Sequence, residues 1–206
     1  MNGTLLDSGA NDGFSTWQLA NRFPHHRILS VEPIATNVDE IYKKKAWGLP
    51  SSGLAKRHAW RLPNVQIVHG GLGATLGFGS YPAKLDDQKG SGAVQTGLLS
   101  LYDNQAQQKY RRLYPIYTLD SLIQPHHERL VFAHIDVEGA EPEVLHGGEQ
   151  TIMHDRPILT VETFPKSNTT RHRILMDRLR FLHYKCHMLD ESCGWGDCRN
   201  LVCVPM

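Results

Sequence analysis

The sequence has no uninterrupted apolar run of about 18 residues, so it offers no candidate for a membrane-spanning helix. Its N-terminus also lacks the basic and then apolar profile of a signal peptide. Only four cysteines occur among the 206 residues, which is too few for a disulfide-scaffolded fold. The net charge of +1 gives no general attraction to nucleic acid or membranes. We therefore expect one domain over residues 1–206, cytoplasmic by default, with no nucleic-acid partner.

The chain opens with the elements that begin a nucleotide-binding α/β fold. A short apolar run, Gly3–Leu6, predicts a buried strand, and a turn over Gly9–Gly13 follows it. Residues 15–23 predict a helix that is capped by Ser15 or Thr16. A strand, a glycine turn and a helix in this order form the first unit of such folds. The glycines would let a ligand lie against the backbone, because no Cβ intervenes.

This turn is not the dinucleotide fingerprint, which requires the pattern G-x-G-x-x-G. Asp7 and Asp12 flank the turn and would repel a pyrophosphate at the helix N-terminus. They suit a ligand that carries hydroxyl groups and positive charge. S-adenosylmethionine is such a ligand, since it has a sulfonium, an ammonium, a ribose and no phosphate. The alternative is a tight turn that binds nothing.

Strands and helices alternate along the rest of the chain. Further strands are expected at Arg27–Val31, Val65–Val68, Leu130–Ile135 and Pro157–Val161. Helices are expected at 35–47, at 119–123 with Thr118 as the cap, at 142–147 and at 169–182. Tyr184–Leu189 and Asn200–Val204 predict a terminal hairpin. Residues 74–96 resist assignment, and 103–112 predict a short helix. The alternation indicates a parallel sheet with helices on both faces.

Ligands of such sheets bind outside the carboxyl ends of the strands. Four of the five strand ends carry an acid, namely Asp7, Glu32, Asp136 and Glu162, and the fifth carries Gly70-Gly71. Glu32 stands about 20 residues beyond the glycine turn, where a ribose-binding carboxylate belongs. Because it ends a strand, its substitution should barely change stability. The alternative for Glu32 is a surface glutamate at a strand end.

Two motifs carry a family resemblance, LDSGANDGFS at residues 6–15 and HIDVEGAE at residues 134–141, the second continuing through VLHG at 144–147. With them, the chain resembles the FkbM-like branch of the S-adenosylmethionine-dependent methyltransferases over essentially its whole length. The resemblance implies one methyltransferase domain over residues 1–206. It also implies a Rossmann-like three-layer α/β sandwich, whose seven-stranded sheet is mostly parallel with an antiparallel last strand.

The resemblance also implies where the cofactor, S-adenosyl-L-methionine, would bind. The residues that would line it are Gly9, Ala10, Asn11 and Gly13 in the turn, Asp7 near its methionine end, Glu32 at the ribose, Gly71 and Leu72 at the adenine, and Asp136 beside the methionine and the reacting centre. No ligand cluster with metal spacing is recognisable near the strand ends, so we expect no metal requirement.

Members of the family characteristically methylate hydroxyl oxygens, so the resemblance implies an O-methyltransferase for a small-molecule or glycan acceptor, such as a sugar or natural product. An alcohol acceptor needs a base, and Asp136 and Glu138 follow the fourth strand, where the pocket should lie. His134 is expected to be a packed core residue, and Glu141 is expected to complement the dipole at the N-terminus of its helix. Two alternatives stay open. One is an N- or RNA-methyltransferase, suggested by the basic run 43–61, and the other is a non-catalytic S-adenosylmethionine-binding relative.

The four cysteines lie in the predicted terminal hairpin. Cys193 and Cys198 flank its tip and can form one bridge in an oxidising compartment, or stay reduced in a cytosol. Cys186 and Cys203 are expected to be small buried core residues. A zinc site that combines these cysteines with nearby histidines is the less favoured alternative, because no Cys-x-x-Cys pair occurs.

Overall fold

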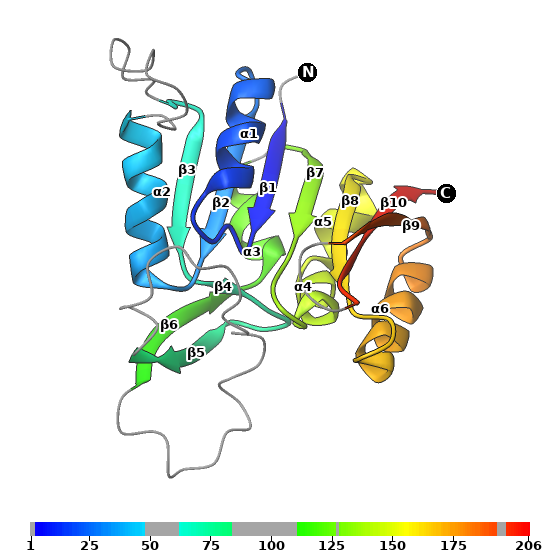
Figure 1. The fold of residues 1–206 in the computed structure, drawn as a ribbon. Coiled ribbons are helices and arrows are strands. Elements are labelled where there is room, and N and C mark those ends of the chain that lie inside the picture. Colours follow the sequence, from blue (N-terminus) through cyan, green and yellow to red (C-terminus); the bar gives the residue numbers. More distant parts are fainter. Residues whose placement is uncertain (1–2, 48–61, 84–110, 127, 193–196) are drawn as a thin grey trace.

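A seven-stranded sheet with the strand order β3-β2-β1-β7-β8-β10-β9 forms the centre of the molecule (Figure 1). The computed structural model describes residues 3–47, 62–83, 111–126, 128–192 and 197–206. The strands of this sheet are β1 (Thr4–Ser8), β2 (Arg27–Glu32), β3 (Val65–His69), β7 (Leu130–Ile135), β8 (Ile158–Thr163), β9 (Tyr184–Ser192) and β10 (Arg199–Pro205). Neighbouring strands from β3 to β8 run parallel, whereas β10 is antiparallel to both β8 and β9.

Helices cover both faces of this sheet. They are α1 (Phe14–Arg22), α2 (Ala35–Trp47), α3 (Leu119–Ile123), α4 (Glu141–Gly147), α5 (Glu149–Asp155) and α6 (Thr169–Phe181), with a 3-10 turn η4 at Gln124–His126. Leu5 of β1 packs with Ala20 of α1, whereas the next residue, Leu6, faces the cluster that contains residues of α3 to α6. Successive strand residues point to opposite faces, so the sheet is a middle layer. The predicted three-layer α/β sandwich, with its antiparallel last strand, is confirmed.

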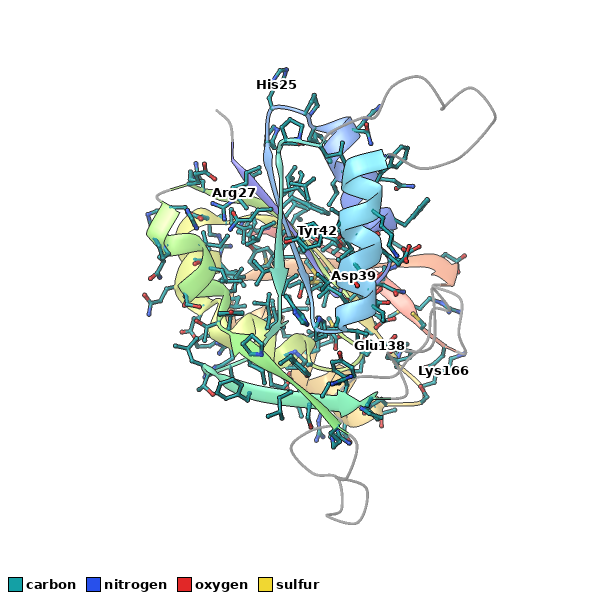
Figure 2. The ribbon with its side chains drawn as sticks, turned by 90° about the vertical axis from the view of Figure 1, so that its left-hand side faces the viewer. His25, Arg27, Asp39, Tyr42, Glu138 and Lys166 are labelled. Atoms are coloured by element: carbon teal, nitrogen blue, oxygen red, sulfur yellow. A yellow bond between two sulfur atoms is a disulfide. The ribbon has the colours of Figure 1, made fainter. Side chains whose placement is uncertain are left out.

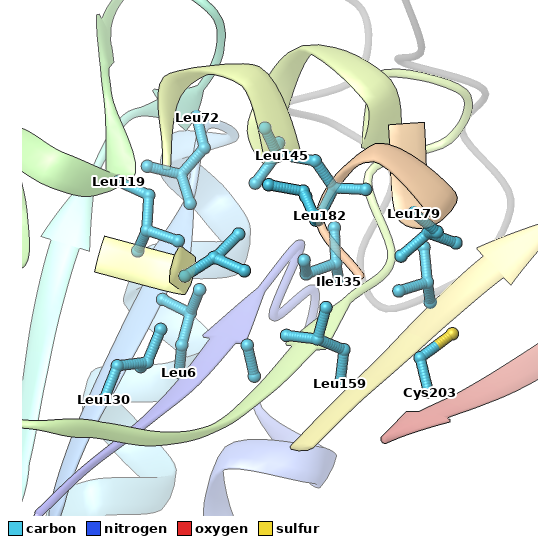
Figure 3. Packing of buried hydrophobic residues seen from close by; sticks show 14 of the residues in the cluster. Leu6, Leu72, Leu119, Leu130, Ile135, Leu145, Leu159, Leu179, Leu182 and Cys203 are labelled. Carbon is cyan, nitrogen blue, oxygen red and sulfur yellow. The ribbon is translucent and has the colours of Figure 1, made fainter. Parts of the chain in front are cut away.

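The larger core lies between the sheet and helices α3 to α6 (Figure 3). Leu6 and Ile135 of the sheet are fully buried there, together with Leu145 of α4 and Leu179 of α6. Helical spacing in the sequence predicts Val144 and Leu145 as the inward residues of α4, and both are fully buried. The same spacing predicts Ile174 of α6 as buried, which is wrong because this residue is 45% exposed.

A second, three-stranded sheet in the order β4-β6-β5 was not predicted. It consists of β4 (Gly71–Leu72), β5 (Gly77–Pro82) and β6 (Arg111–Tyr117), and it lies below the carboxyl edge of the large sheet in Figure 1. Arg111 and Arg112 begin β6, so the end of the helix predicted at 103–112 is wrong; the rest of that range lies outside the described residues. Tyr81 and Tyr114 stack and pack against Ile34, which joins this sheet to the main domain.

The first helix begins two residues earlier than a cap at Ser15 or Thr16 would allow. Helix α1 starts at Phe14, and its N-cap is Gly13 in the left-handed conformation, with φ of 82°. The hydroxyl of Thr16 instead donates a hydrogen bond to Asp7. The predicted cap of α3 is confirmed, since Thr118 Oγ1 accepts a hydrogen bond from the backbone N–H of Ser121.

The terminal hairpin is present as β9 and β10, but its cysteines are paired differently from the prediction. Cys186 and Cys203 were expected to be small buried core residues; Cys203 lies in the core and Cys186 packs against it, but the two form a disulfide, which was not predicted. The two residues are direct partners in the antiparallel register, which puts their side chains close together on one face. The predicted bridge between Cys193 and Cys198 involves Cys193, which lies outside the described residues. No helix in the described part of the chain is long and apolar enough to cross a membrane.

Candidate functional site

The acids predicted at the strand ends gather at one edge of the sheet. The ends of β1 and β2 are paired at Ser8 and Val31, and the backbone N–H of Asp136 donates to the carbonyl of Ser8 over 3.0 Å. In Figure 2, Glu138 lies in the lower half of the molecule, on the side toward which β1 and β7 point in Figure 1, whereas His25 lies at the top. This carboxyl edge is the candidate site.

The two glycines of the first turn are required by the packing of the chain itself. A Cβ on Gly9 would lie 1.7 Å from the carbonyl oxygen of Asp136, and a Cβ on Gly13 would lie 2.9 Å from Ile41. Both glycines also have positive φ angles, 79° and 82°. We predicted that the missing Cβ atoms leave space for a ligand, but the backbone of Asp136 just beyond β7 and Ile41 of α2 occupy these positions.

The backbone donors of this turn are also used within the protein. The N–H groups of Gly9 and Ala10 donate to the carbonyl of Val31 over 3.0 and 3.2 Å. The N–H of Asn11 donates to Glu32, and that of Gly13 donates to the carbonyl of Ala10. A phosphate site needs such amides to be free, so these bonds agree with the exclusion of a dinucleotide.

Glu32 is held by three donors instead of lying at a solvent-exposed strand end. Its Oε2 accepts the Asn11 N–H over 2.8 Å, and its Oε1 accepts the Ile34 N–H and the Asn37 side chain over 3.0 and 3.1 Å. Glu32 is 3% exposed, and its burial raises the pKa of its carboxyl group to about 7, although the three hydrogen bonds lower this pKa. The expectation that substitution would barely change stability assumed an exposed strand end, and Glu32 is instead buried and hydrogen-bonded. A carboxylate has about four acceptor positions, so one remains for a ligand.

Asp7 is fully buried under the same edge. Its Oδ2 accepts a hydrogen bond of 2.5 Å from Thr16, whereas its Oδ1 has no partner among the described residues. Burial is the main reason that its pKa is raised, and the charge of Asp136 acts in the same direction. Because the side chain has no exposed surface, Asp7 offers no direct contact surface to a ligand at this edge.

The two residues predicted beside an adenine form strand β4. Leu72 is 6% exposed, and its side chain belongs to the hydrophobic core. A Cβ on Gly71 would lie 2.9 Å from the ring of Tyr114, so the small sheet packs closely over this glycine. Only the backbone of this segment is left as a contact surface for a ligand.

Asp136 and Glu138, the predicted bases, are joined by Glu162 at the end of β8. One carboxylate oxygen of each residue lies within 4.8 Å of the other two. Burial, followed by the charge of Asp136, raises the pKa of Glu138 to about 7 and that of Glu162 to about 10. Sequence reasoning placed Glu162 at the edge but did not select it as a site residue. A sheet in which β8 lies beside β7 puts the end of β8 next to the end of β7, so this strand order could have pointed to Glu162 as a neighbour of Asp136.

Two other acid–base candidates have structural partners. Glu141 is 4% exposed, and its Oε1 accepts the N–H groups of Val137 and Gly139 over 3.1 and 3.0 Å, so it stabilises the loop that carries Glu138. His134 is half-buried, and its Nδ1 lies 2.9 Å from the hydroxyl of Thr160. Neither residue belongs to the group formed by Asp136, Glu138 and Glu162.

A model of the methyltransferase FkbM domain matches residues 7–186, which include the second motif, all of the first motif except Leu6, and all the acids described above. The chain belongs to the FkbM methyltransferase family. The family resemblance read from the motifs is thus confirmed, and this is a family of S-adenosylmethionine-dependent methyltransferases. A comparison of the FkbM chain with curated proteins returns no match.

Solved structures share the fold of this FkbM chain. A methyltransferase FkbM from Methylobacillus flagellatus superposes with a TM-score of 0.58 at 16% identity, covering 98% of this chain and 43% of that chain. The present chain therefore spans less than half the length of that relative. An O-methyltransferase from Bacillus cereus in complex with SAH gives a TM-score of 0.52 at 15% identity, covering 98% of this chain and 73% of that chain. A fibrillarin from Aeropyrum pernix with natively bound S-adenosyl-L-methionine gives a TM-score of 0.54 at 10% identity, covering 98% of this chain and 66% of that chain.

Proposed function

We propose that this protein transfers the methyl group of S-adenosyl-L-methionine to a hydroxyl oxygen of a sugar or natural-product-like acceptor. The observation that carries the proposal is the gathering of Asp136, Glu138 and Glu162 at the carboxyl edge of an FkbM fold. The edge is acidic, and the amides of Gly9, Ala10, Asn11 and Gly13 in the turn beside it are already bonded within the protein. These features suit a cationic cofactor and a neutral, hydroxyl-bearing acceptor.

The residues at the edge fit S-adenosylmethionine. Glu32 has one acceptor position free and would accept a hydrogen bond from a ribose hydroxyl. Gly9, Ala10, Asn11 and Gly13 would line the adenosine side through their surfaces rather than through their N–H groups. Asp136 would lie beside the positively charged methionine portion, above the buried Asp7. When bound, the cofactor supplies an electrophilic methyl group.

The protein must also remove a proton from the acceptor, since a neutral alcohol is a poor nucleophile. Glu138 is half-buried, and its pKa of about 7 is close to the value that makes a general base effective at neutral pH. Asp136, two residues earlier, is the second candidate. The backbone of Glu138 is held in a left-handed conformation, with φ of 56°, in a loop that Glu141 stabilises. This arrangement fixes the carboxylate next to Asp136.

The test is methyl transfer from isotopically labelled S-adenosylmethionine to a hydroxyl-rich metabolite extract and, in parallel, to an RNA pool. We expect label in the hydroxyl-rich extract and little in RNA. Replacement of Glu138 by Gln should lower kcat by about 10²-fold to 10⁴-fold, the usual contribution of a general base. Glu40→Gln is the matched control, because Glu40 lies on α2 and pairs with Lys43 over 2.6 Å, outside the site.

The same experiment distinguishes the proposed function from its two alternatives. Label in RNA alone would support the nucleic-acid methyltransferase, whose basic run at 43–61 lies mostly outside the described residues. Binding of the cofactor without transfer to any pool would support a non-catalytic relative.

A further inference from the structure

In the part of the chain that the structure describes, the three acids at the carboxyl edge lack a positive partner. Asp136, Glu138 and Glu162 lie within 4.8 Å of one another, measured between one carboxylate oxygen of each. In the described ranges, none of the three forms an ion pair with a lysine, arginine or histidine. Three carboxylates at this separation repel one another strongly unless protons or a cation intervene.

Glu162 adds a second observation, because it is a buried acid with an oxygen that the chain leaves unsatisfied. It is 5% exposed, and its Oε2 accepts no hydrogen bond from an N–H or O–H group of the described residues; the side chain that faces Glu162 is another acid, Asp136. Its Oε1 lies 2.9 Å from Sγ of Cys198. Glu32 and Glu141 are equally buried at the same edge, but their carboxylates accept backbone N–H groups over 2.8 to 3.1 Å. A buried carboxylate oxygen without a donor is strongly unfavourable, so a ligand is expected to satisfy it.

We propose that Asp136, Glu138 and Glu162 bind one hard divalent cation of the Mg²⁺ or Mn²⁺ class. Carboxylate oxygens are the ligands these ions prefer, and the site has no nitrogen or thiolate ligand that would favour zinc or copper. Both ions favour six ligands, so three carboxylates leave positions for water or for oxygens of an acceptor. Asp136 and Glu138 are half-buried, which gives an ion a route to the buried oxygen of Glu162.

This inference replaces the expectation of a metal-free site. The sequence did not reveal the cluster because its third member comes from a different strand, 24 positions beyond Glu138. The inference rests on the geometry of the cluster and not on methyl transfer. A measurement of ion binding alone can therefore fail while the proposed function stands, or succeed while that function fails.

The experiment is a titration of the EDTA-treated, dialysed protein with Mn²⁺, followed by electron paramagnetic resonance of the free ion and by calorimetry. We expect one bound Mn²⁺ per chain and its displacement by Mg²⁺. Glu162→Gln and Asp136→Asn each remove one negative ligand at nearly constant volume and should weaken binding at least about tenfold, since affinity follows the ligand charge. Glu40→Gln and Asp39→Asn, both on α2, are the matched controls and should bind as the wild type does.

Circular dichroism and thermal unfolding would show whether each variant is folded. If Glu162→Gln does not fold, the half-exposed Glu138→Gln provides the same test. If folded wild-type protein does not bind Mn²⁺ at millimolar Mn²⁺, the proposal is overturned. The repulsion among the three acids would then be relieved by protons or by a cationic ligand instead of a metal ion. Binding that persists unchanged in the Glu162, Asp136 and Glu138 variants would place the ion elsewhere and would overturn it equally.

Discussion

Substitution of Glu32 by Gln should change how stability depends on pH. Glu32 is 3% exposed, and burial raises its pKa from 4.5 to about 7. Between these two values the folded protein holds a proton that the unfolded chain has released. The stability contributed by this protonation is therefore fully present below about pH 4.5 and is lost as the pH rises through about 7.

The size of the effect follows from the same two pKa values. A difference of one pKa unit corresponds to about 1.4 kcal/mol. The ionisation of Glu32 should therefore lower the free energy of unfolding of the wild-type protein by about 2–3 kcal/mol as the pH rises from 5 to 8. Gln cannot ionise and does not contribute to this slope. At pH 5 the protonated Glu and the Gln each offer one acceptor oxygen and one donor, so the two proteins should have similar stability. At pH 8 the Glu32→Gln variant should be the more stable one.

Urea unfolding of wild type and Glu32→Gln at pH 5 and pH 8 measures this difference directly. Other buried acids at the edge also affect the wild-type profile, but they are common to both proteins and cancel in the comparison. Glu40→Gln, on the surface of α2, should keep the wild-type pH profile. Parallel pH profiles for wild type and Glu32→Gln would refute the reasoning, because they would mean that Glu32 keeps its ordinary pKa in the folded state.

Three further predictions concern the cofactor, the first turn and the core. Glu32→Gln at pH 8 should weaken S-adenosylhomocysteine about tenfold to a hundredfold in calorimetry, since a hydrogen bond to a charged group is worth about 1.5–3 kcal/mol; unchanged affinity would remove Glu32 from the site. Gly9→Ala places a Cβ 1.7 Å from a backbone carbonyl and should cost more than about 3 kcal/mol in urea unfolding, whereas Gly77→Ala, with nothing within 4 Å, should cost less than about 1 kcal/mol. Leu145→Ala should cost about 2–5 kcal/mol, against less than about 1 kcal/mol for the exposed Ile174→Ala; equal losses would contradict the assigned packing.

The alternation of apolar runs and helical patterns was sufficient to predict the main sheet. It was sufficient because parallel strands are buried on both faces and read as short apolar segments, as at Leu130–Ile135. The small sheet has no such pattern. Strand β5 contains two glycines and ends in Pro82, so its sequence resembles a loop, and its stability comes from pairing with β6 and from the Tyr81–Tyr114 contact.

The site was predictable at the level of strand ends but not at the level of contacts. The carboxyl ends of parallel strands meet at one edge, so the positions of Asp7, Glu32 and Asp136 followed from the topology. The distance from Asp136 to Glu162 depends on neighbouring strands that lie far apart in sequence. The disulfide between Cys186 and Cys203 likewise depends on the register of two strands, which composition does not define.

The central claim is that the acidic carboxyl edge binds S-adenosylmethionine, and a crystal structure with S-adenosylhomocysteine tests it most directly. We predict a ribose hydroxyl within hydrogen-bond distance of Glu32 and the amino-acid portion of the ligand beside Asp136. A ligand bound at another face, or an edge without ligand in crystals grown at millimolar S-adenosylhomocysteine, would contradict the claim.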